Sequence, residues 1–521
     1  MTAVPADPAT SPGQTNTSLE IPVDELIAEL RPRFEADEHR AGEGPRVLFS
    51  SCRPGLSAMG HWISHVESLV AARLRRTHQA SCSFAVDDVG LRRVTKRTAY
   101  RAFAFDRFHP ASAHDVRHED RLDADDDLAS LTVDELLATE RAGVPLGRVA
   151  GVSLRKTLRR STIGPGDAKD LARWITCGRD HLRWAEAVLD DVRPDAVVTN
   201  HTTYIEHGGI WHHLCLARGI PTVTWQAAGR NTVIARRLTA SEASQHVAGL
   251  SAEAWQQIVT RPDADSLASE ARAHLDRRAR GDDQRIPSAP KIGTAHQPEA
   301  FDPASIWPSD DARPLIGVFT HLPWDAAGGH YNDLFSDLRA WVAATARAAA
   351  LNDRARWVFR IHPAESVRGT EEHFGDVARA EAGRAAHVHI VESETPISSY
   401  AIARHLSAAV TVRGTLAIEL GARGLPVVCA GSSAPRIAEF NLFPDSADAY
   451  LDLLGQIESV PPLDAPAQRR AELYAWWHFI ASRLELRCID RFDDITALRS
   501  LTPEAVETDA ALGRVAEMLL G

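Results

Sequence analysis

The residues best suited to chemistry lie in the stretch from Trp357 to Glu365, which reads WVFRIHPAE. A run of apolar and aromatic residues ends there in Arg360, His362 and Glu365. The proline after His362 cannot continue a central sheet ladder, so the stretch predicts a buried strand that stops at this point. Arginine and histidine beyond the carboxyl end of a strand in an open α/β sheet suit a phosphate group. The alternative is a strand end that merely carries polar residues.

The elements that must position this stretch alternate between strand and helix patterns. After residue 312, five strand-like segments are separated by helical ones, which predicts a parallel sheet. These strands are expected in PLIGVFTHLPWD, WVFRIHP, HVHIVE (387–392), AAVTVRGT (408–415) and LPVVCAG (425–431).

The first half of the chain shows the same alternation. Strands are expected at 46–50, 83–86, 193–200 and in IPTVTW, with helices at 64–76 and 167–190 between them. A strand, a glycine-containing loop and a helix open a doubly wound domain. The segment 106–130 is charged and is expected to be irregular.

The predicted fold class is therefore α/β, with two Rossmann-like domains whose parallel sheets face a central cleft. A Pro-rich stretch between the two halves is the best candidate for a linker. The predicted divisions are a disordered N-terminus plus helix (1–45), an N-terminal acceptor domain (46–285), a linker (286–312), a C-terminal donor domain (313–490) and C-terminal helices (491–521).

The second half resembles the surface-carbohydrate and capsule-polysaccharide biosynthesis proteins, which have the GT-B glycosyltransferase fold. A looser likeness extends to bacterial sialyl- and Kdo-transferases and to glycerophosphotransferases. The resemblance covers roughly residues 312–490 and rests on five motifs in order: FTHLPWDAAG (319–328), WVFRIHPAE (357–365), TPISSYAIARHLSAAVTV (395–412), RGTLAIELGARGLPVVCAG (413–431) and ELYAWWHFI (472–480).

The resemblance implies that His362 lies against the donor phosphate, as a hydrogen-bond donor or as a proton source for the leaving group. The loop of Arg413, Gly414 and Thr415 opens a helix and would bind phosphate through backbone N–H groups and a hydroxyl. Glu419 would accept ribose hydroxyls, or would simply be a glutamate on a helix surface. Relatives usually have two small hydroxyl residues before a glycine in this loop, so Arg413 leaves the donor nucleotide open.

The acceptor hydroxyl must lose a proton as it attacks, so an inverting enzyme needs a base. Three residues at strand ends or helix starts are candidates: His61, at a position where some GT-B enzymes place their base; Glu206, after the VVTN strand; and Asp325, after the first strand of the second domain. Each also has a structural interpretation, as a packing residue, a turn residue or a loop cap.

Bulk properties exclude several classes of function. The formal net charge of −12 argues against nucleic-acid binding. No apolar run approaches the roughly 20 residues of a membrane span. Scattered cysteines and an acidic run without a preceding strand predict neither a disulfide framework nor a metal site. The basic cluster 155–160 is expected to be a solvated helix face, with an anionic acceptor as the alternative.

Together these features predict a glycosyltransferase that needs no metal and no cofactor besides its nucleotide-sugar donor. Its expected partners are that donor and a carbohydrate or small-molecule acceptor, and its expected location is the cytoplasm, with the inner face of the membrane as an alternative. Three other functions remain open: a CDP-polyol phosphotransferase, a nucleotide-sugar epimerase and a non-catalytic nucleotide-sugar binding protein.

Overall fold

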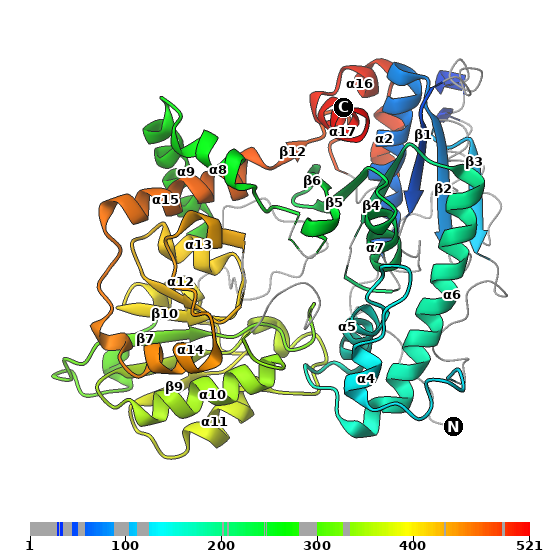
Figure 1. Cartoon of the computed structure of the whole chain (residues 1–521). Coiled ribbons are helices and arrows are strands. Elements are labelled where there is room, and N and C mark those ends of the chain that lie inside the picture. The colour runs from blue at the N-terminus through cyan, green and yellow to red at the C-terminus, as the bar shows by residue number, and fades with distance from the viewer. Residues whose placement is uncertain are drawn as a thin grey trace.

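The structure is a computed structural model of the chain. It describes residues 29–30, 32–34, 44–50, 58–87, 104–111, 124–200, 203–205, 208–243, 245, 247–280, 300–326, 334–431, 434–491 and 495–521. The described residues form two α/β lobes that lie side by side (Figure 1).

The first lobe is built on a mostly parallel sheet. Its strands, in the order in which they pair, are β12 (Leu484–Glu485), β6 (Thr232–Leu238), β5 (Thr222–Ala227), β4 (Ala196–Asn200), β1 (Arg46–Ser50), β2 (Ser81–Asp87) and β3 (Arg107–Ala111). β12 and β6 pair antiparallel, as do β6 and β5, and the remaining pairs are parallel.

Alternate residues of each strand face opposite sides of this sheet, so two separate cores form. Val47 and Phe49 belong to a core shared with α2 (Ala58–His78), whereas Leu48 belongs to a core on the other face. That second core is completed by the helices α5 (Leu146–Leu158), α6 (Ala168–Val192) and α7 (Gly209–Ala217), next to the short α4 (Val133–Leu137). Both faces are thus covered, as parallel sheets require.

The second lobe contains the five-stranded parallel sheet that the sequence predicts. Its strand order is β11 (Val427–Cys429), β10 (Ala408–Thr411), β7 (Leu315–Phe319), β8 (Arg356–Arg360) and β9 (Val388–Val391). The described helices of this lobe are α10 (Leu338–Leu351), α11 (Phe374–Ala382), α12 (Ser399–Ala403), α13 (Leu416–Gly421), α14 (Ala447–Leu454) and α15 (Ala465–Trp476).

The predicted fold class is confirmed, because both lobes are α/β units, one built on a mostly parallel sheet and the other on a parallel sheet. Two details of the first half differ from the prediction. The segment 106–130 contains the strand β3, which pairs with β2 and carries too short and polar a pattern, RFHPA, to be recognised. β6 follows β5 and pairs with it antiparallel, and its Arg-rich sequence TVIARRL did not predict a strand.

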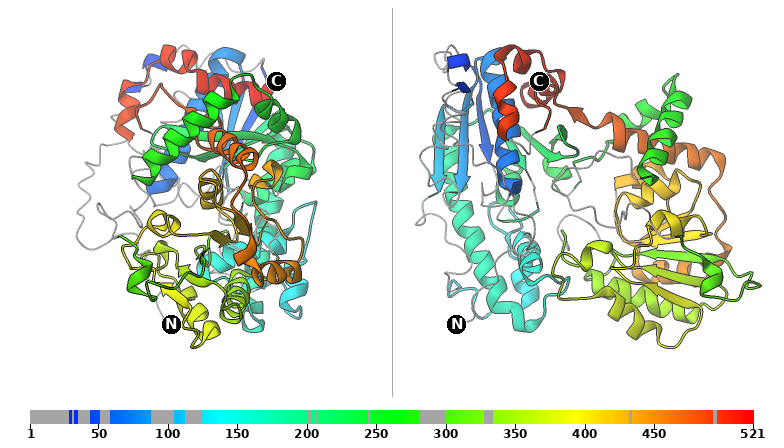
Figure 2. Two further views of the ribbon diagram at one scale, coloured as in Figure 1. Left: turned by 90° about the vertical axis from the view of Figure 1, so that its left-hand side faces the viewer. Right: turned by 180° about the vertical axis from the view of Figure 1, so that it is seen from behind.

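The chain crosses between the lobes in both directions. The helices α8 (Ala252–Val259) and α9 (Ala264–Ala279), which the sequence assigns to the first domain, pack in one core with α15 of the second. After α15 the chain returns: β12 joins the first sheet, and α16 (Pro503–Thr508) and α17 (Ala510–Leu520) contact α2. Figure 2 shows this return from two further sides. The predicted boundary at residue 490 therefore comes after the crossing.

Candidate functional site

The carboxyl ends of β10, β7 and β8 lie next to one another, because these three strands pair in that order. Each strand is followed closely by a cationic or titratable residue: Arg413, His321 and His362 respectively. The rings of His321 and His362 lie 6.2 Å apart between centroids. The charge of Arg413 is close enough to His321 to lower its pKa. The sheet thus gathers two imidazoles and a guanidinium at one edge, where open α/β sheets bind ligands.

His362 is fixed by two hydrogen bonds at the start of a 3-10 turn, Pro363–Glu365. Its backbone N–H donates to Thr320 Oγ1 (2.9 Å), and its Nδ1 accepts from the N–H of Ala364 (3.1 Å). An Nδ1 that accepts leaves the proton of the neutral ring on Nε2. Burial lowers the pKa of His362, with Asp325 acting in the opposite direction. At neutral pH the ring is therefore an uncharged hydrogen-bond donor through Nε2.

His321 has the opposite tautomer. Its Nδ1 lies 3.0 Å from the carbonyl oxygen of Leu322, which can only accept, so Nδ1 carries the proton and Nε2 has a lone pair. Burial and then the charge of Arg413 lower the pKa of His321, whereas Asp325 raises it. His321 was not among the residues predicted from the sequence, although it lies in the FTHLPWD motif two residues after the end of β7.

Asp325 joins this cluster to the first lobe. The hydroxyl of Tyr204 donates to Asp325 Oδ1 (3.0 Å) and accepts from the N–H of Ala326 (3.0 Å). Asp325 itself is exposed, while Tyr204 is 7% exposed and lies after β4 in the first lobe. The candidate base predicted from sequence thus lies beside both imidazoles and is held by a residue of the opposite lobe.

The loop between β10 and α13 combines one buried and two exposed residues. Arg413 is 5% exposed, and its backbone carbonyl oxygen accepts a hydrogen bond from the Thr411 hydroxyl at 3.2 Å. Gly414 has φ +116°, which a residue with a side chain rarely adopts. Thr415 is exposed and its hydroxyl does not cap α13. Backbone and hydroxyl groups are therefore available to a ligand beside Arg413.

Two predicted donor-binding residues have other partners. Arg360 is 2% exposed and donates to the carbonyl oxygens of Glu392 and Thr395 (3.1 Å for Thr395), so its guanidinium anchors the loop after β9. Glu419 is 3% exposed and accepts hydrogen bonds from Tyr400 and from Arg278 of α9 (3.4 Å). It is therefore not a surface glutamate, because it joins α9 to α13. Its predicted contact with a ribose stays a prediction.

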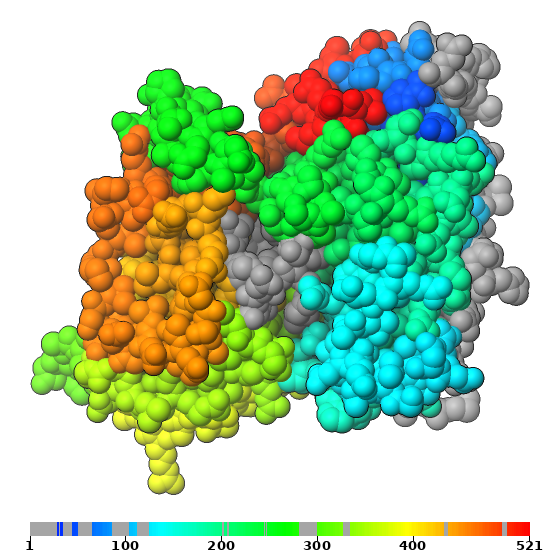
Figure 3. Space-filling view, viewed as in Figure 1, coloured from blue at the N-terminus to red at the C-terminus, as the bar shows by residue number. Residues whose placement is uncertain are grey.

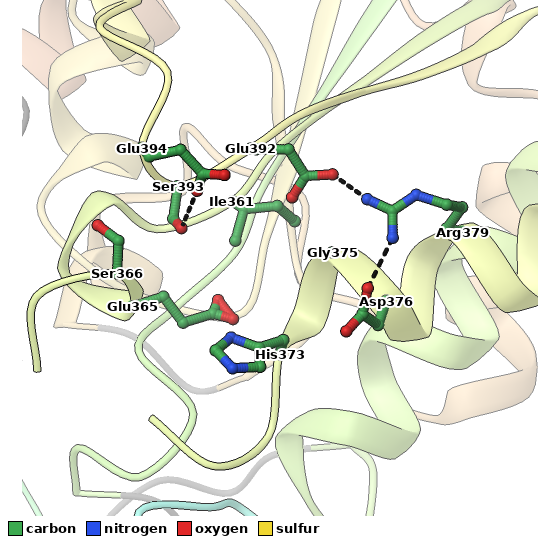
Figure 4. Close-up of a pocket in the computed structure, with 10 residues that line it drawn as sticks. All are labelled: Ile361, Glu365, Ser366, His373, Gly375, Asp376, Arg379, Glu392, Ser393 and Glu394. Carbon is green, nitrogen blue, oxygen red and sulfur yellow. Dashed lines mark hydrogen bonds and ion pairs between the residues drawn. The ribbon is translucent and has the colours of Figure 1, made fainter. Parts of the chain in front are cut away.

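Of the remaining predicted site residues, the structure describes the side chain of Glu365 but not those of His61 and Glu206. Glu365 lines a pocket beside the His362 turn, together with residues of α11 and of the loop after β9 (Figure 4). His61 lies in α2, but its side chain is outside the described part of the structure. Glu206 lies outside the described residues altogether.

The basic cluster 155–160 does not form a solvated face, because it lies against the second lobe and its own loop. Arg155 is 8% exposed and donates to the carbonyl of Ser161 at 2.7 Å. The guanidinium of Arg159 lies 4.4 Å from the ring centroid of Trp324 in the second lobe. The Lys156 ammonium lies 4.3 Å from the ring centroid of Tyr204.

A carboxylate of the second lobe completes this contact. Glu372 accepts hydrogen bonds from the backbone N–H of Ser161 (2.9 Å), its hydroxyl (2.6 Å) and the hydroxyl of Thr162 (3.3 Å). The N–H of Glu371 donates to the carbonyl of Arg159 at 3.0 Å. Figure 3 shows the two lobes meeting in the lower half of the view. The loop that follows α5 is thus an interlobe contact next to Trp324 and Asp325.

Two residues of the acidic run of the first lobe form ion pairs. Arg179 of α6 binds Asp125 (3.0 Å) and Asp127 (2.8 Å). Among the described side chains, no group of three or more His, Cys, Asp or Glu residues is arranged to hold a metal ion. The described cysteines form no disulfide. Within the same residues, no helix has the length and apolar character needed to cross a membrane.

No protein-family model and no curated protein matches the chain. It is similar to several solved structures. The KpsC beta Kdo 2,4 transferase of Thermosulfurimonas dismutans is 12% identical over 53% of this chain and 79% of that one, with a TM-score of 0.32. The calicheamicin glycosyltransferase CalG4 is 14% identical over 91% and 100%, with a TM-score of 0.26. The UDP-GlcNAc 2-epimerase of Neisseria meningitidis is 10% identical over 82% and 96%, with a TM-score of 0.24. At these values the likenesses assign no activity to the chain.

Proposed function

We propose that the protein is a glycosyltransferase that moves a sugar from a nucleotide-activated donor to a carbohydrate or small-molecule acceptor. The observation that carries the proposal is the cluster of His321, His362 and Arg413 at adjacent strand ends, with Asp325 between the lobes. Cationic and N–H donor groups at that edge suit the charge that develops on a departing nucleoside phosphate.

In the proposed reaction, the acceptor oxygen forms a bond to the anomeric carbon while the bond from that carbon to the donor phosphate oxygen breaks. The electron pair leaves with the phosphate, where Nε2–H of His362 and the guanidinium of Arg413 stabilise it. The proton of the acceptor hydroxyl goes to Asp325, whose Oδ1 is oriented by Tyr204. The lone pair on His321 Nε2 offers a second place for that proton.

A metal-independent mechanism is part of the proposal. The charge of the leaving phosphate would be met by Arg413 and by the two imidazoles, whose lowered pKa values rise when an anion binds beside them. Arg413 and the two imidazoles would bind only the phosphate, so specificity for the nucleotide, the sugar and the acceptor would come from other residues. A cytoplasmic location, at the inner face of the membrane if the acceptor is a polymer, accompanies the proposal.

The first experiment measures thermal shifts with CMP, CDP, UDP and GDP on the wild type and on His362→Ala. A nucleotide that binds the folded state raises the melting temperature, by mass action, and the variant should lose that rise. His405→Ala is the matched control, because His405 is exposed and precedes β10, at the opposite edge of the sheet. If none of the four nucleotides shifts the wild type, the proposed nucleotide site is wrong.

The second experiment follows the nucleotide-sugar that corresponds to the best ligand. Transfer predicts that nucleotide release depends on an acceptor and that the product contains no phosphorus from the donor. A phosphorus-containing product would instead indicate a polyol phosphotransferase. Conversion of the sugar-nucleotide without any acceptor would indicate an epimerase, and binding without turnover under all conditions would indicate a binding protein.

A further inference from the structure

A pocket of about 430 Å³ lies beside the His362 turn, in the size range of small-molecule sites. Its walls come from the end of β8, the first turns of α11 and the loop after β9 (Figure 4). The lining residues are Ile361, Glu365, Ser366, His373, Gly375, Asp376, Arg379, Glu392, Ser393 and Glu394.

The lining is strongly acidic, because four carboxylates face a single guanidinium. That guanidinium, Arg379, is already shared between Asp376 Oδ1 (2.7 Å) and Glu392 Oε1. Glu394 accepts from the hydroxyl of Ser393 at 2.9 Å. Negative charge therefore exceeds positive charge in the lining, which favours a cationic occupant.

Glu365 provides the second, independent observation. Its side chain is 1% exposed and lines the pocket. Oε1 accepts from the N–H of Phe374 at 2.7 Å, whereas Oε2 has no hydrogen-bond partner among the described residues. A buried polar atom without a hydrogen-bond partner is unfavourable, so a ligand that donates to Oε2 would be bound favourably.

The glycine at position 375 shows that the wall is closely built. A Cβ at this position would lie 2.5 Å from Glu392 Oε2, so that carboxylate lies directly against the start of α11. The described carboxylates are not arranged as a metal site, which leaves an organic cation as the fitting occupant.

We propose that this pocket binds the protonated amine of an amino sugar, through Glu365 Oε2 and the surrounding carboxylates. An ammonium group carries a compact positive charge and three N–H donors, which match an unpartnered carboxylate oxygen in an acidic wall. That the amine belongs to a sugar rests on the proposed function, because the pocket adjoins the proposed donor site: its lining residue Ile361 directly precedes His362. The ammonium follows from the pocket itself.

The charge state of Glu365 links this binding to pH. Burial is the main cause that raises the pKa of Glu365 to about 7. The N–H of Phe374 acts against it, and the neighbouring carboxylates of Glu392, Glu372 and Asp376 act with it. The other charged or titratable groups around the pocket are His373, Arg379 and Glu394, with Arg360 beneath the loop. An ammonium favours the ionised carboxylate, so binding releases a proton and tightens as pH rises through 7.

The test uses the full chain with 6-amino-6-deoxyglucose as the probe and glucose as the matched neutral sugar. Saturation-transfer NMR and calorimetry should show the amine binding at least about tenfold more tightly than glucose. Its affinity should rise between about pH 6 and about pH 8, with proton release in buffers of different ionisation enthalpy. Equal binding of the two sugars, or affinity that falls over that range, overturns the proposal.

Glu365→Gln tests the residue, since it retains the shape and removes the ionisable group. It should weaken amine binding about tenfold and abolish the proton release that comes from the protein. Glu381→Gln is the control: Glu381 lies on α11 outside the pocket and pairs with Arg347. Undiminished amine binding in Glu365→Gln would contradict the proposal even if Glu381→Gln behaved as expected.

The outcome is separable from that of the proposed function. Nucleotide thermal shifts report on the His362 cluster, whereas amine binding reports on Glu365. Nucleotide binding without amine binding would leave the proposed function standing and remove this inference. Amine binding without any nucleotide thermal shift would support the amine site at Glu365 and contradict the proposed nucleotide site.

Discussion

Tyr204 and Asp325 are 121 residues apart in the chain and lie on different lobes, yet the Tyr204 hydroxyl donates to Asp325 Oδ1 at 3.0 Å. The Tyr204 hydroxyl oxygen also accepts from the N–H of Ala326. One phenol therefore fixes both the side chain and the backbone of the loop that carries the candidate base. This contact makes the orientation of Asp325 depend on how the lobes are placed.

Tyr204→Phe should therefore lower kcat of sugar transfer while changing donor affinity little. The variant keeps the ring, on which Lys156 lies, and removes only the hydroxyl. Loss of such hydrogen bonds costs on the order of 1 kcal/mol in stability, and misorientation of a base costs about tenfold or more in rate. Steady-state kinetics and nucleotide thermal shifts separate the two effects. An equal loss of donor binding would contradict the assignment of Tyr204 to Asp325.

The two imidazoles should respond differently to glutamine. A glutamine at position 362 can still donate from its amide, so His362→Gln should retain about tenfold more activity than His362→Ala.

His321→Gln should alter the acid limb of the pH profile of kcat/KM. In the wild type that limb should lie below pH 6.5, because the pKa of His321 is lowered from that value. Profiles of donor turnover check both points, and an unchanged limb in His321→Gln would remove His321 from the proton path.

Acid should destabilise the first lobe through His212. This residue is fully buried in α7, donates from Nε2 to the carbonyl of Ala243 (3.0 Å) and accepts at Nδ1 from Thr224 (3.2 Å). Burial lowers the pKa of His212 to about 4, so the unfolded chain takes up a proton first as pH falls below 6.5. The folded state should lose about 2 kcal/mol between about pH 7 and about pH 5 from this group alone.

Urea unfolding at both pH values measures this loss, with His212→Gln as the comparison. The variant has no ionisable group at this position, so its loss of stability over the same range should be smaller by about 2 kcal/mol. An identical pH dependence in the two proteins would show that the pKa of His212 is the same in the folded and unfolded states, contrary to the effect expected of its burial.

Glu372→Gln should weaken the contact between the lobes. The carboxylate accepts from Ser161 twice and from Thr162, and hydrogen bonds to a charged acceptor contribute roughly 1.5 to 3 kcal/mol each in favourable settings. We expect a lower melting temperature and a larger radius of gyration by small-angle scattering. The neighbouring Glu371→Gln is the control, because Glu371 is exposed and only its backbone N–H bonds Arg159. The same effect in both variants would point to a general charge effect.

Much of the second lobe could be predicted because its signals are local. Apolar runs of strand length that end in Pro363 or Gly414 determine where strands stop, and the residues after them must lie at the carboxyl edge of a parallel sheet. This is why the sequence alone could place His362, Arg413 and Asp325 near the ends of these strands. β3 and β6 could not, since their polar and Arg-rich patterns form strands only against a neighbour already in place.

The sequence by itself determined which residues stand at the strand ends and that the fold is α/β. Only the tertiary structure decided which of them meet. The pairing order β10, β7, β8 brings His321 beside His362, and it turns Arg360 away to the carbonyls of the next loop. The packing of α9 on the second lobe engages Glu419, and the lobe contact brings Tyr204 to Asp325. These choices depend on contacts between residues far apart in the chain, which no local pattern encodes.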